Sequence, residues 1–477
     1  MKNVNRRQLF LVVGLILLTG VVMGIAAHPR PAVLPSPGPG ADIVKIPEGA
    51  ITMKAHLVQD KVLLGSDGRA TLALTLEASD AQRPGEAPAP VDLVVVLDRS
   101  GSMNGQKIRD ARRAVLALMD TLSPNDRLGI VTYSNAPEAL SALRPMTTAH
   151  RRELSALVRG ILPGGGTNLG GGLKAGLAMF SDLPMDDHHR KLLLISDGLA
   201  NHGVTDPHGL GRMAASALSR DWVVSTVGVG NDFNEHLMTT LADYGGGTYT
   251  YLEDPAAFAA VFEQEYHHAV ATAASGMTIN VPLGHGVQLI DAGGYPIETR
   301  DAKASFHPGG LRFGQTRTLY LTFKVPTDTP GEVPVEGLQL GFGSSEGRVT
   351  TRLPQTFTIA CVENPDEVMA SIRRDSWAAQ VVQEDFGRLK AVVADALREG
   401  DKEQALEQIE AYRMEKEAIN QVVASPRVSE NLHKDVEALG DVVRETFAGR
   451  AEAVASKQKK AAKALQYESY RERRDKK

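Results

Sequence analysis

The sequence predicts an α/β fold: a doubly wound, mostly parallel sheet that is inserted in or flanked by an antiparallel β-sandwich and followed by a C-terminal α-helical region. Three observations support this prediction. Between residues 91 and 270, short apolar runs alternate with helical patterns, which is typical of a parallel sheet with helices on both faces. From residue 271 to 362, apolar residues recur with a period of two between Gly and Pro breaks. After Pro365, residues with high helix propensity dominate at helical spacing.

Residues 1–28 read as a signal anchor or a signal peptide. Basic residues precede an uncharged apolar run, Leu9–Ala27, which as a helix would cross most of a hydrocarbon core about 30 Å thick. The positive charge predicts a cytosolic N-terminal end, so the bulk of the chain would lie outside the cytosol, in the periplasm or the extracellular space. We favour an uncleaved, single-pass membrane anchor, because the run is longer than the apolar part of most signals. Gly24 and Ala26 leave cleavage and secretion as the alternative.

Residues 29–41 form a Pro-rich linker, which can build neither helix nor ladder. Residues 42–80 then contain two alternating runs separated by a Gly-Ser-Asp-Gly turn, which indicates a hairpin. Two strands alone are not stable, so we expect them to pair with the strands of 271–362. The α/β part would then be an insertion into one sandwich.

The most informative segment is Val91–Met103, an apolar run that ends in an Asp-x-Ser-Gly-Ser turn. In open α/β sheets, ligands bind beyond the carboxyl ends of the strands. Asp98, Ser100 and Ser102 lie at such an end, and their hard oxygens suit Mg²⁺, Mn²⁺ or Ca²⁺ better than zinc. The pattern therefore predicts a cation site.

Two later segments complete the oxygen set. Residues 162–173 form a glycine-rich loop that presents Thr167 ahead of a helix, and residues 191–198 form a second buried strand ending at Asp197. Each of these motifs on its own is ordinary turn or cap chemistry. Three of them in this order and at βα spacing favour a shared metal site.

With these residues in place, the chain resembles a von Willebrand factor type A (VWA) domain that carries a metal-ion-dependent adhesion site, the MIDAS, and is similar to bacterial membrane-anchored VWA proteins. The family pattern falls on Asp98, Ser100, Ser102, Thr167 and Asp197 without a departure. The resemblance implies that Ser100, Ser102 and, in the high-affinity form, Thr167 contact the cation directly, and that the two carboxylates hold coordinating waters. One position would be left for an Asp or Glu carboxylate of a partner protein.

Two functions follow from the resemblance. The first is divalent-cation-dependent protein interaction or adhesion at the cell envelope. The alternative is a structural envelope scaffold in which the metal only stabilises the VWA loops and the helical region recruits partners. Chelation separates the two, because only the first loses its partner when the cation is removed.

The C-terminal part divides into a helical hairpin or bundle, residues 363–455, and a basic tail, residues 456–477. Gly400 is expected to end one helix, and Asp401 with Gln404 to start the next. The tail is expected to be solvated and partly disordered. The single cysteine, Cys361, excludes an intrachain disulfide and is expected to be a small buried residue.

Other function classes are not favoured. No phosphate-binding or dinucleotide-binding glycine motif occurs, and no Gly-x-Ser-x-Gly surrounds the two serines, so no enzymatic activity and no catalytic residue are predicted. His202 is the one histidine near the motif loops and is expected to border the site. The formal net charge of −5 with 5% aromatic residues gives no case for nucleic-acid binding.

Overall fold

The computed structural model describes residues 43–44, 51–80, 89–181, 183, 188–344 and 347–474. Within residues 91–270, six strands form one sheet in the order β10-β9-β8-β5-β6-β7. Neighbours are parallel except β7, which runs antiparallel to β6 at one edge. The strands are β5 (Val91–Asp98), β6 (Arg127–Tyr133), β7 (Pro137–Pro145), β8 (His189–Ser196), β9 (Trp222–Val229) and β10 (Gly246–Leu252). The predicted mostly parallel sheet is confirmed.

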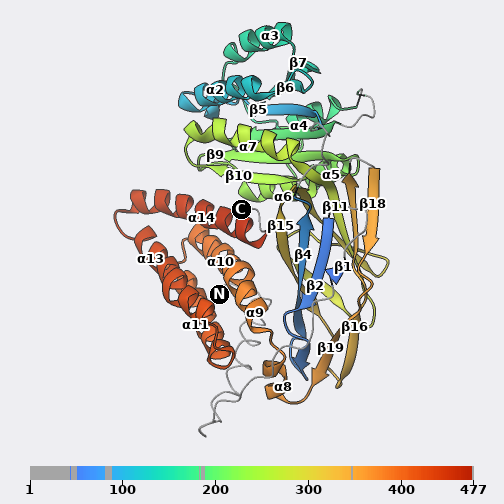
Figure 1. The fold of residues 1–477 in the computed structure, drawn as a ribbon. Helices are drawn as coiled ribbons and strands as arrows, with labels where there is room; N and C mark the ends of the chain where they lie inside the picture. Colours follow the sequence, from blue (N-terminus) through green and yellow to red (C-terminus); the bar gives the residue numbers. More distant parts are fainter. Residues whose placement is uncertain are drawn as a thin grey trace.

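Helices cover both faces of this sheet (Figure 1). Every residue of β5 is buried, because alternate side chains enter the two cores: Leu93 and Val95 on one side, Val94 and Val96 on the other. The first core contains α2 (Gln106–Thr121), α3 (Thr148–Arg159) and α7 (Phe258–Val270), and the second α4 (Leu169–Ala178), α5 (Pro207–Leu218) and α6 (Glu235–Tyr244). Two 3₁₀ turns, η1 (Gly101–Met103) and η2 (Pro255–Ala257), precede α2 and α7.

The glycine-rich sequence continues into α4 because this helix packs very closely on the sheet. A Cβ on Gly172 would lie 2.6 Å from the Tyr133 ring, and one on Gly176 would lie 2.5 Å from a Val96 methyl group. Both distances are shorter than any normal carbon–carbon contact. The glycines thus place the N-terminal end of α4, and the loop before it, directly against β5 and β6.

The antiparallel part is built from strands on both sides of the α/β segment. One sheet has the order β1-β2-β4-β15-β12, a second β13-β14-β11-β17-β18, and a third β16-β19-β3. The strands are β1 (Ile43–Val44), β2 (Ile51–Leu57), β3 (Lys61–Leu63), β4 (Arg69–Ala78), β11 (Thr272–Pro282), β12 (Gln288–Ala292), β13 (Glu298–Arg300), β14 (Lys303–Arg312), β15 (Thr316–Lys324), β16 (Gly331–Val335), β17 (Gln339–Ser344), β18 (Gly347–Arg352) and β19 (Phe357–Val362).

These sheets share one hydrophobic core, which also contains Cys361, buried as expected. The central pairing joins β4 to β15, with Glu77 opposite Thr316 and Arg69 opposite Lys324. Since β4 precedes the α/β segment and β15 follows it, the α/β segment is an insertion into the sandwich.

The helical region follows β19 and packs on the outer face of the β4–β15 pair, where Val58, Ala73 and Tyr320 join its core. Gly400 ends one helix in a left-handed conformation, φ 77°, and the Asp401 carboxylate accepts a hydrogen bond from the Gln404 amide at 2.9 Å, as the sequence predicts. The region consists of α8 (Pro365–Ala370), α9 (Arg374–Gln380), η3 (Val381–Asp385), α10 (Phe386–Glu399), α11 (Lys402–Val423), α12 (Pro426–Glu430), η4 (Asn431–Val436), α13 (Glu437–Thr446) and α14 (Ala451–Arg473); η3 and η4 are π-helical.

The prediction of a solvated basic tail is wrong for the residues that the structure describes. Residues 456–473 belong to α14, which packs against α10 and reaches the α/β part (Figure 1). Tyr470 of this helix enters the hydrophobic core of the α/β part. Two basic residues of the predicted tail are buried in ion pairs: Lys463 lies 2.7 Å from the Glu235 carboxylate, and Arg474, just after the helix, binds Asp243. The partner carboxylates lie in distant parts of the sequence, so composition alone could not reveal them.

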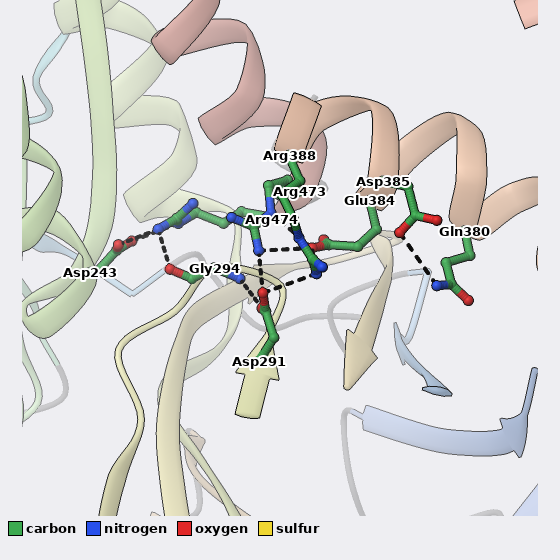
Figure 2. Close-up of polar contacts among 9 residues, drawn as sticks. All are labelled: Asp243, Asp291, Gly294, Gln380, Glu384, Asp385, Arg388, Arg473 and Arg474. Carbon is green, nitrogen blue, oxygen red and sulfur yellow. Dashed lines mark hydrogen bonds and ion pairs between the residues drawn. The ribbon is translucent and has the colours of Figure 1, made fainter. Parts of the chain in front are cut away.

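Arg473 and Arg474, here called the C-terminal arginine pair, connect all three parts of the molecule (Figure 2). Arg474 binds both oxygens of Asp243 in α6 and donates to the Gly294 carbonyl of the sandwich at 2.7 Å. Arg473 binds Asp291 in β12 at 2.7 Å, and further contacts Glu384 of the helical region at 2.8 Å. The helix end thus holds the α/β part, the sandwich and the helical region in one arrangement.

The N-terminal predictions, residues 1–28 and 29–41, lie outside the described residues and stay predictions. Among the helices that the structure does describe, none has the length and apolar character needed to cross a membrane.

Candidate metal centre

Asp98 is the last residue of β5, and its side chain is fully buried. The Ser100 amide donates a hydrogen bond to Oδ1 of Asp98 at 2.7 Å, and the Ser196 hydroxyl donates one to Oδ2 at 2.9 Å. Each carboxylate oxygen therefore has a fixed donor, one from the turn after β5 and one from the end of β8. These bonds hold the carboxylate where the turn leaves the sheet.

Ser100 and Ser102 lie in that turn, and their hydroxyl oxygens are 3.0 Å apart. The Ser102 hydroxyl also donates to Oδ1 of Asp197 at 2.7 Å. Asp197 is buried and directly follows β8, the parallel neighbour of β5. Adjacent parallel strands thus bring Asp98, the two serines and Asp197 together at one sheet edge, as the strand ends in the sequence indicate.

Thr167 reaches the same place from the loop before α4. Backbone hydrogen bonds of 2.7 and 3.0 Å tie residues 164–165 of this loop to residues 99–101 of the turn after β5. The hydroxyls of Ser102 and Thr167 both lie next to Gly198. A Cβ on this glycine would be 3.3 Å from Ser102 Oγ and 3.6 Å from Thr167 Oγ1. The structure therefore brings all five sequence-predicted site residues together.

Further polar residues hold the loop in position. Asn135 accepts a hydrogen bond from the Gly166 amide at 2.6 Å, and Asn201 accepts one from the Thr167 amide at 2.8 Å. The His202 ring lies against Gly166, where a Cβ would be 2.3 Å from the ring. His202 thus borders the site, as the sequence indicates.

The ammonium group of Lys107, in α2, forms an ion pair with one of the site's two carboxylates: its Nζ lies 2.5 Å from Oδ2 of Asp197. Burial raises the pKa of Asp98 to about 6, against the lowering effect of the Ser100 hydrogen bonds, and the negative charge of Asp197 adds to the rise. Two buried carboxylates facing one partly exposed ammonium leave excess negative charge in the site. A cation placed among these oxygens would relieve that charge.

The donor set fits a hard divalent cation such as Mg²⁺. It consists of three hydroxyls and two carboxylates, without a thiol or an imidazole. Ser102 is exposed whereas the other four are buried, so the site opens to solvent on the side of Ser102. Within the described part of the chain, no group of three or more His, Cys, Asp or Glu residues could hold a metal, so the hydroxyls are essential to any cation site.

Sequence reasoning missed four residues around this site: Lys107, Ser196, Asn135 and Asn201. The place of Ser196 at the site could have been predicted from the sequence, because this residue directly precedes Asp197 at the end of a strand. Lys107 is the second residue of the helix after the serine turn, but an ammonium at that position is also common as a solvated residue. The two asparagines act through backbone amides of another loop, which sequence spacing does not show.

Comparison with known proteins agrees with this geometry. Residues 92–264 match the family described as the von Willebrand factor type A domain. The fold of this segment and its family match together show that it is a VWA domain.

Several proteins are similar in sequence to parts of this chain. Protein YfbK of Escherichia coli is 28% identical over 218 residues, which cover 45% of this chain and 37% of that protein. Protein sll0103 of Synechocystis is 22% identical over 57% of this chain and 65% of its own length. An inter-alpha-trypsin inhibitor heavy chain of Mesocricetus auratus is 30% identical over 32% of this chain and 18% of its own length. The chain thus spans less than two thirds of each of these relatives.

Two solved structures are similar to a larger share of this chain than these sequence relatives are. A von Willebrand factor type A protein from Catenulispora acidiphila has a TM-score of 0.67 at 17% identity, over 90% of this chain and 98% of that one. The ArnB paralogue VWA2 from Sulfolobus acidocaldarius has a TM-score of 0.52 at 16% identity, over 88% of this chain and 99% of its own. At these identities the likeness concerns the fold, and it extends beyond the VWA domain to the sandwich and the helices.

Proposed function

We propose that this protein binds a divalent cation at Asp98, Ser100, Ser102, Thr167 and Asp197, and through that cation the carboxylate of a partner protein. The observation that carries the proposal is that five oxygen-bearing side chains from three loops meet at one place, and two of them are buried carboxylates. When bound, the cation supplies an electrophilic centre that attracts an Asp or Glu of the partner. The five residues would fix the position of the cation and leave the site open to the partner on the side of Ser102.

The loops around the site offer apolar surface for a protein rather than for a small solute. Leu162 in the Thr167 loop is 70% exposed, and Leu199 and Val204 in the Asp197 loop are 59% and 49% exposed. Apolar side chains on the same loops as a charged centre are typical of a protein contact, in which the polar group gives specificity and the apolar rim gives buried area. These three residues form the proposed rim.

Isothermal titration calorimetry with Mg²⁺ tests the metal. Ser100→Ala with Ser102→Ala should abolish binding and leave the circular dichroism spectrum unchanged, since the hydroxyls lie beyond the strand end. Asp197→Asn should weaken the affinity by about 10- to 100-fold, the usual effect of losing a group that orients metal-bound water. Ser123→Ala is the matched control, because this exposed serine lies at the opposite end of the sheet. Undiminished Mg²⁺ affinity in the double serine variant would refute the site.

Partner capture separates adhesion from a scaffold role. We expect a pull-down from membranes to retain a partner in Mg²⁺ and to lose it in EDTA or with Asp98→Ala. Capture that survives both treatments, with the fold intact, would favour the scaffold, in which the metal only stabilises the loops.

We further propose that the protein acts at the cell envelope, tethered by Leu9–Ala27 with the VWA domain outside the cytosol. The basic residues before the apolar run support this orientation. Protease added to spheroplasts should digest the VWA domain. Digestion only after lysis would contradict the orientation.

A further inference from the structure

A polar cavity of about 210 Å³ lies at the free edge of the VWA sheet, away from the metal centre. β10 is the edge strand there, and the cavity is closed by α7, by the end of β14 in the sandwich and by α14. One water molecule needs only about 15 Å³ of such space. The cavity therefore has room for a small ligand with several non-hydrogen atoms.

Two arginines of the sandwich, Arg312 and Arg317, line this cavity. Arg317 is only 4% exposed and donates from its two terminal nitrogens to the carbonyls of Pro308 and Gly310, at 2.6 and 3.0 Å. Its Nε is buried and has no hydrogen-bond partner. Carbonyl oxygens do not neutralise a guanidinium, so its charge is uncompensated.

Arg312 lines the same cavity and is partly buried. Burial and the positive charge of Arg317 lower the pKa of Arg312, and the negative charge of Glu265 raises it. Within the described residues, neither arginine forms an ion pair with a carboxylate. A second guanidinium beside the buried Arg317 is costly unless an anion joins the two.

The carboxylates that line the cavity are already engaged. Glu265 lies 2.7 Å from the Lys191 ammonium and accepts a hydrogen bond from the Thr248 hydroxyl at 2.5 Å. Asp221 lies 3.3 Å from Arg348. Glu265 acts on Arg312 without an ion pair, and its charge raises the pKa of Arg312. Because both carboxylates have cationic partners of their own, positive charge is left in excess at the two arginines.

We propose that this cavity binds a small oxyanion, a phosphate or carboxylate group, between Arg312 and Nε of Arg317. Guanidinium groups present planar N–H donors that match the oxygens of such anions, and charge-assisted hydrogen bonds of this kind are about twice as strong as neutral ones. The ligand would offset the repulsion between the arginines and satisfy the unpaired Nε. It would also bridge the sandwich and the VWA domain at their junction.

Calorimetry on the whole protein, freed of metal with EDTA and then dialysed into chelator-free buffer, tests this site without a contribution from the metal centre. Phosphate, sulfate and succinate are titrated separately at constant ionic strength, so that the arms distinguish a tetrahedral oxyanion from a carboxylate. We expect saturable binding of at least one of them with a stoichiometry of one. Arg312→Gln should weaken it at least tenfold and Arg312→Lys by less, whereas the matched control Arg300→Gln, an exposed arginine on β13 of the same sheet, should leave it unchanged.

Modification of the wild-type protein gives a second readout that needs no variant. Phenylglyoxal labels accessible arginines, and mass spectrometry follows each one. We expect the bound anion to slow labelling of Arg312 several-fold and to leave Arg300 unaffected. Equal labelling with and without the anions, or heats that sodium chloride reproduces at equal ionic strength, would overturn the proposal.

Discussion

Replacing Arg474 by Met tests whether the C-terminal arginine pair holds the three parts of the molecule together. The substitution keeps an unbranched side chain and removes the two contacts to Asp243 and the contact to the Gly294 carbonyl. Asp243 is only 3% exposed, so it would be left as a buried carboxylate without its partner. Breaking a buried ion pair in this way costs about 3–5 kcal/mol of unfolding free energy.

The sequence offers a selective assay, because its two tryptophans lie in different parts. Trp222 starts β9 of the VWA domain, and Trp377 lies in α9 of the helical region; both are buried. In a Trp377→Phe background, fluorescence reports urea unfolding of the VWA domain alone. With a urea dependence of roughly 2 kcal/mol per molar, Arg474→Met should lower the midpoint by about 1.5–2.5 M.

Arg413→Met is the matched control, since Arg413 is 40% exposed and, among the described residues, bonds only to carboxylates of its own helix, α11. Exposed pairs of this kind contribute about 0–1 kcal/mol, so the midpoint should move by about 0.5 M at most. A double-mutant cycle with Asp243→Asn should give a coupling of about 2 kcal/mol or more. Equal midpoints for the Arg474 and Arg413 variants, or a coupling near zero, would refute the reasoning.

Three further predictions concern single residues of the VWA domain. Lys107→Met removes the ammonium that competes with the cation, so Mg²⁺ should bind roughly 3- to 10-fold tighter in calorimetry, whereas Lys174→Met on the exposed face of α4 should change nothing. Burial would raise the pKa of Glu265, but the Lys191 ammonium outweighs this effect and lowers the pKa to about 2. The stability that this ion pair contributes is therefore present above about pH 4.5, and about 3 kcal/mol of it should be lost as the pH falls toward 2. The Glu265→Gln variant should not show this loss. Gly176→Ala places a methyl group against Val96 and should lower the unfolding free energy by about 1–3 kcal/mol in urea titrations; no change would show that α4 is free to move.

The sequence was sufficient for the elements whose signals are local. β5 and β8 are long apolar runs because both faces of each strand are covered, and the ends of these runs place Asp98 and Asp197 correctly. The end of α10 at Gly400 follows from a left-handed residue that only glycine adopts easily. These predictions needed no knowledge of residues far away in the chain.

Elements defined by distant contacts were not predicted. β7 has no clear alternation, with mostly exposed residues, and its antiparallel pairing depends on β6. α14 looked like a solvated tail because Glu235 and Asp243, which receive Lys463 and Arg474, lie more than 200 positions earlier. Lys107 was missed for the same reason, since its contact with Asp197 crosses 90 positions.

The pairing of β4 with β15 also sets an order in which the molecule can be assembled. Thr75 and Thr318, which face each other across these strands, are separated by 243 positions, and the VWA domain lies between them. All strands of the VWA sheet fall within its own segment, so the domain can fold before the sandwich. Once folded, it shortens the flexible chain between the two threonines to roughly a quarter, which lowers the entropy cost of closing the sandwich by about 1 kcal/mol. The inserted domain therefore acts as a preformed bridge for the sandwich strands on either side of it.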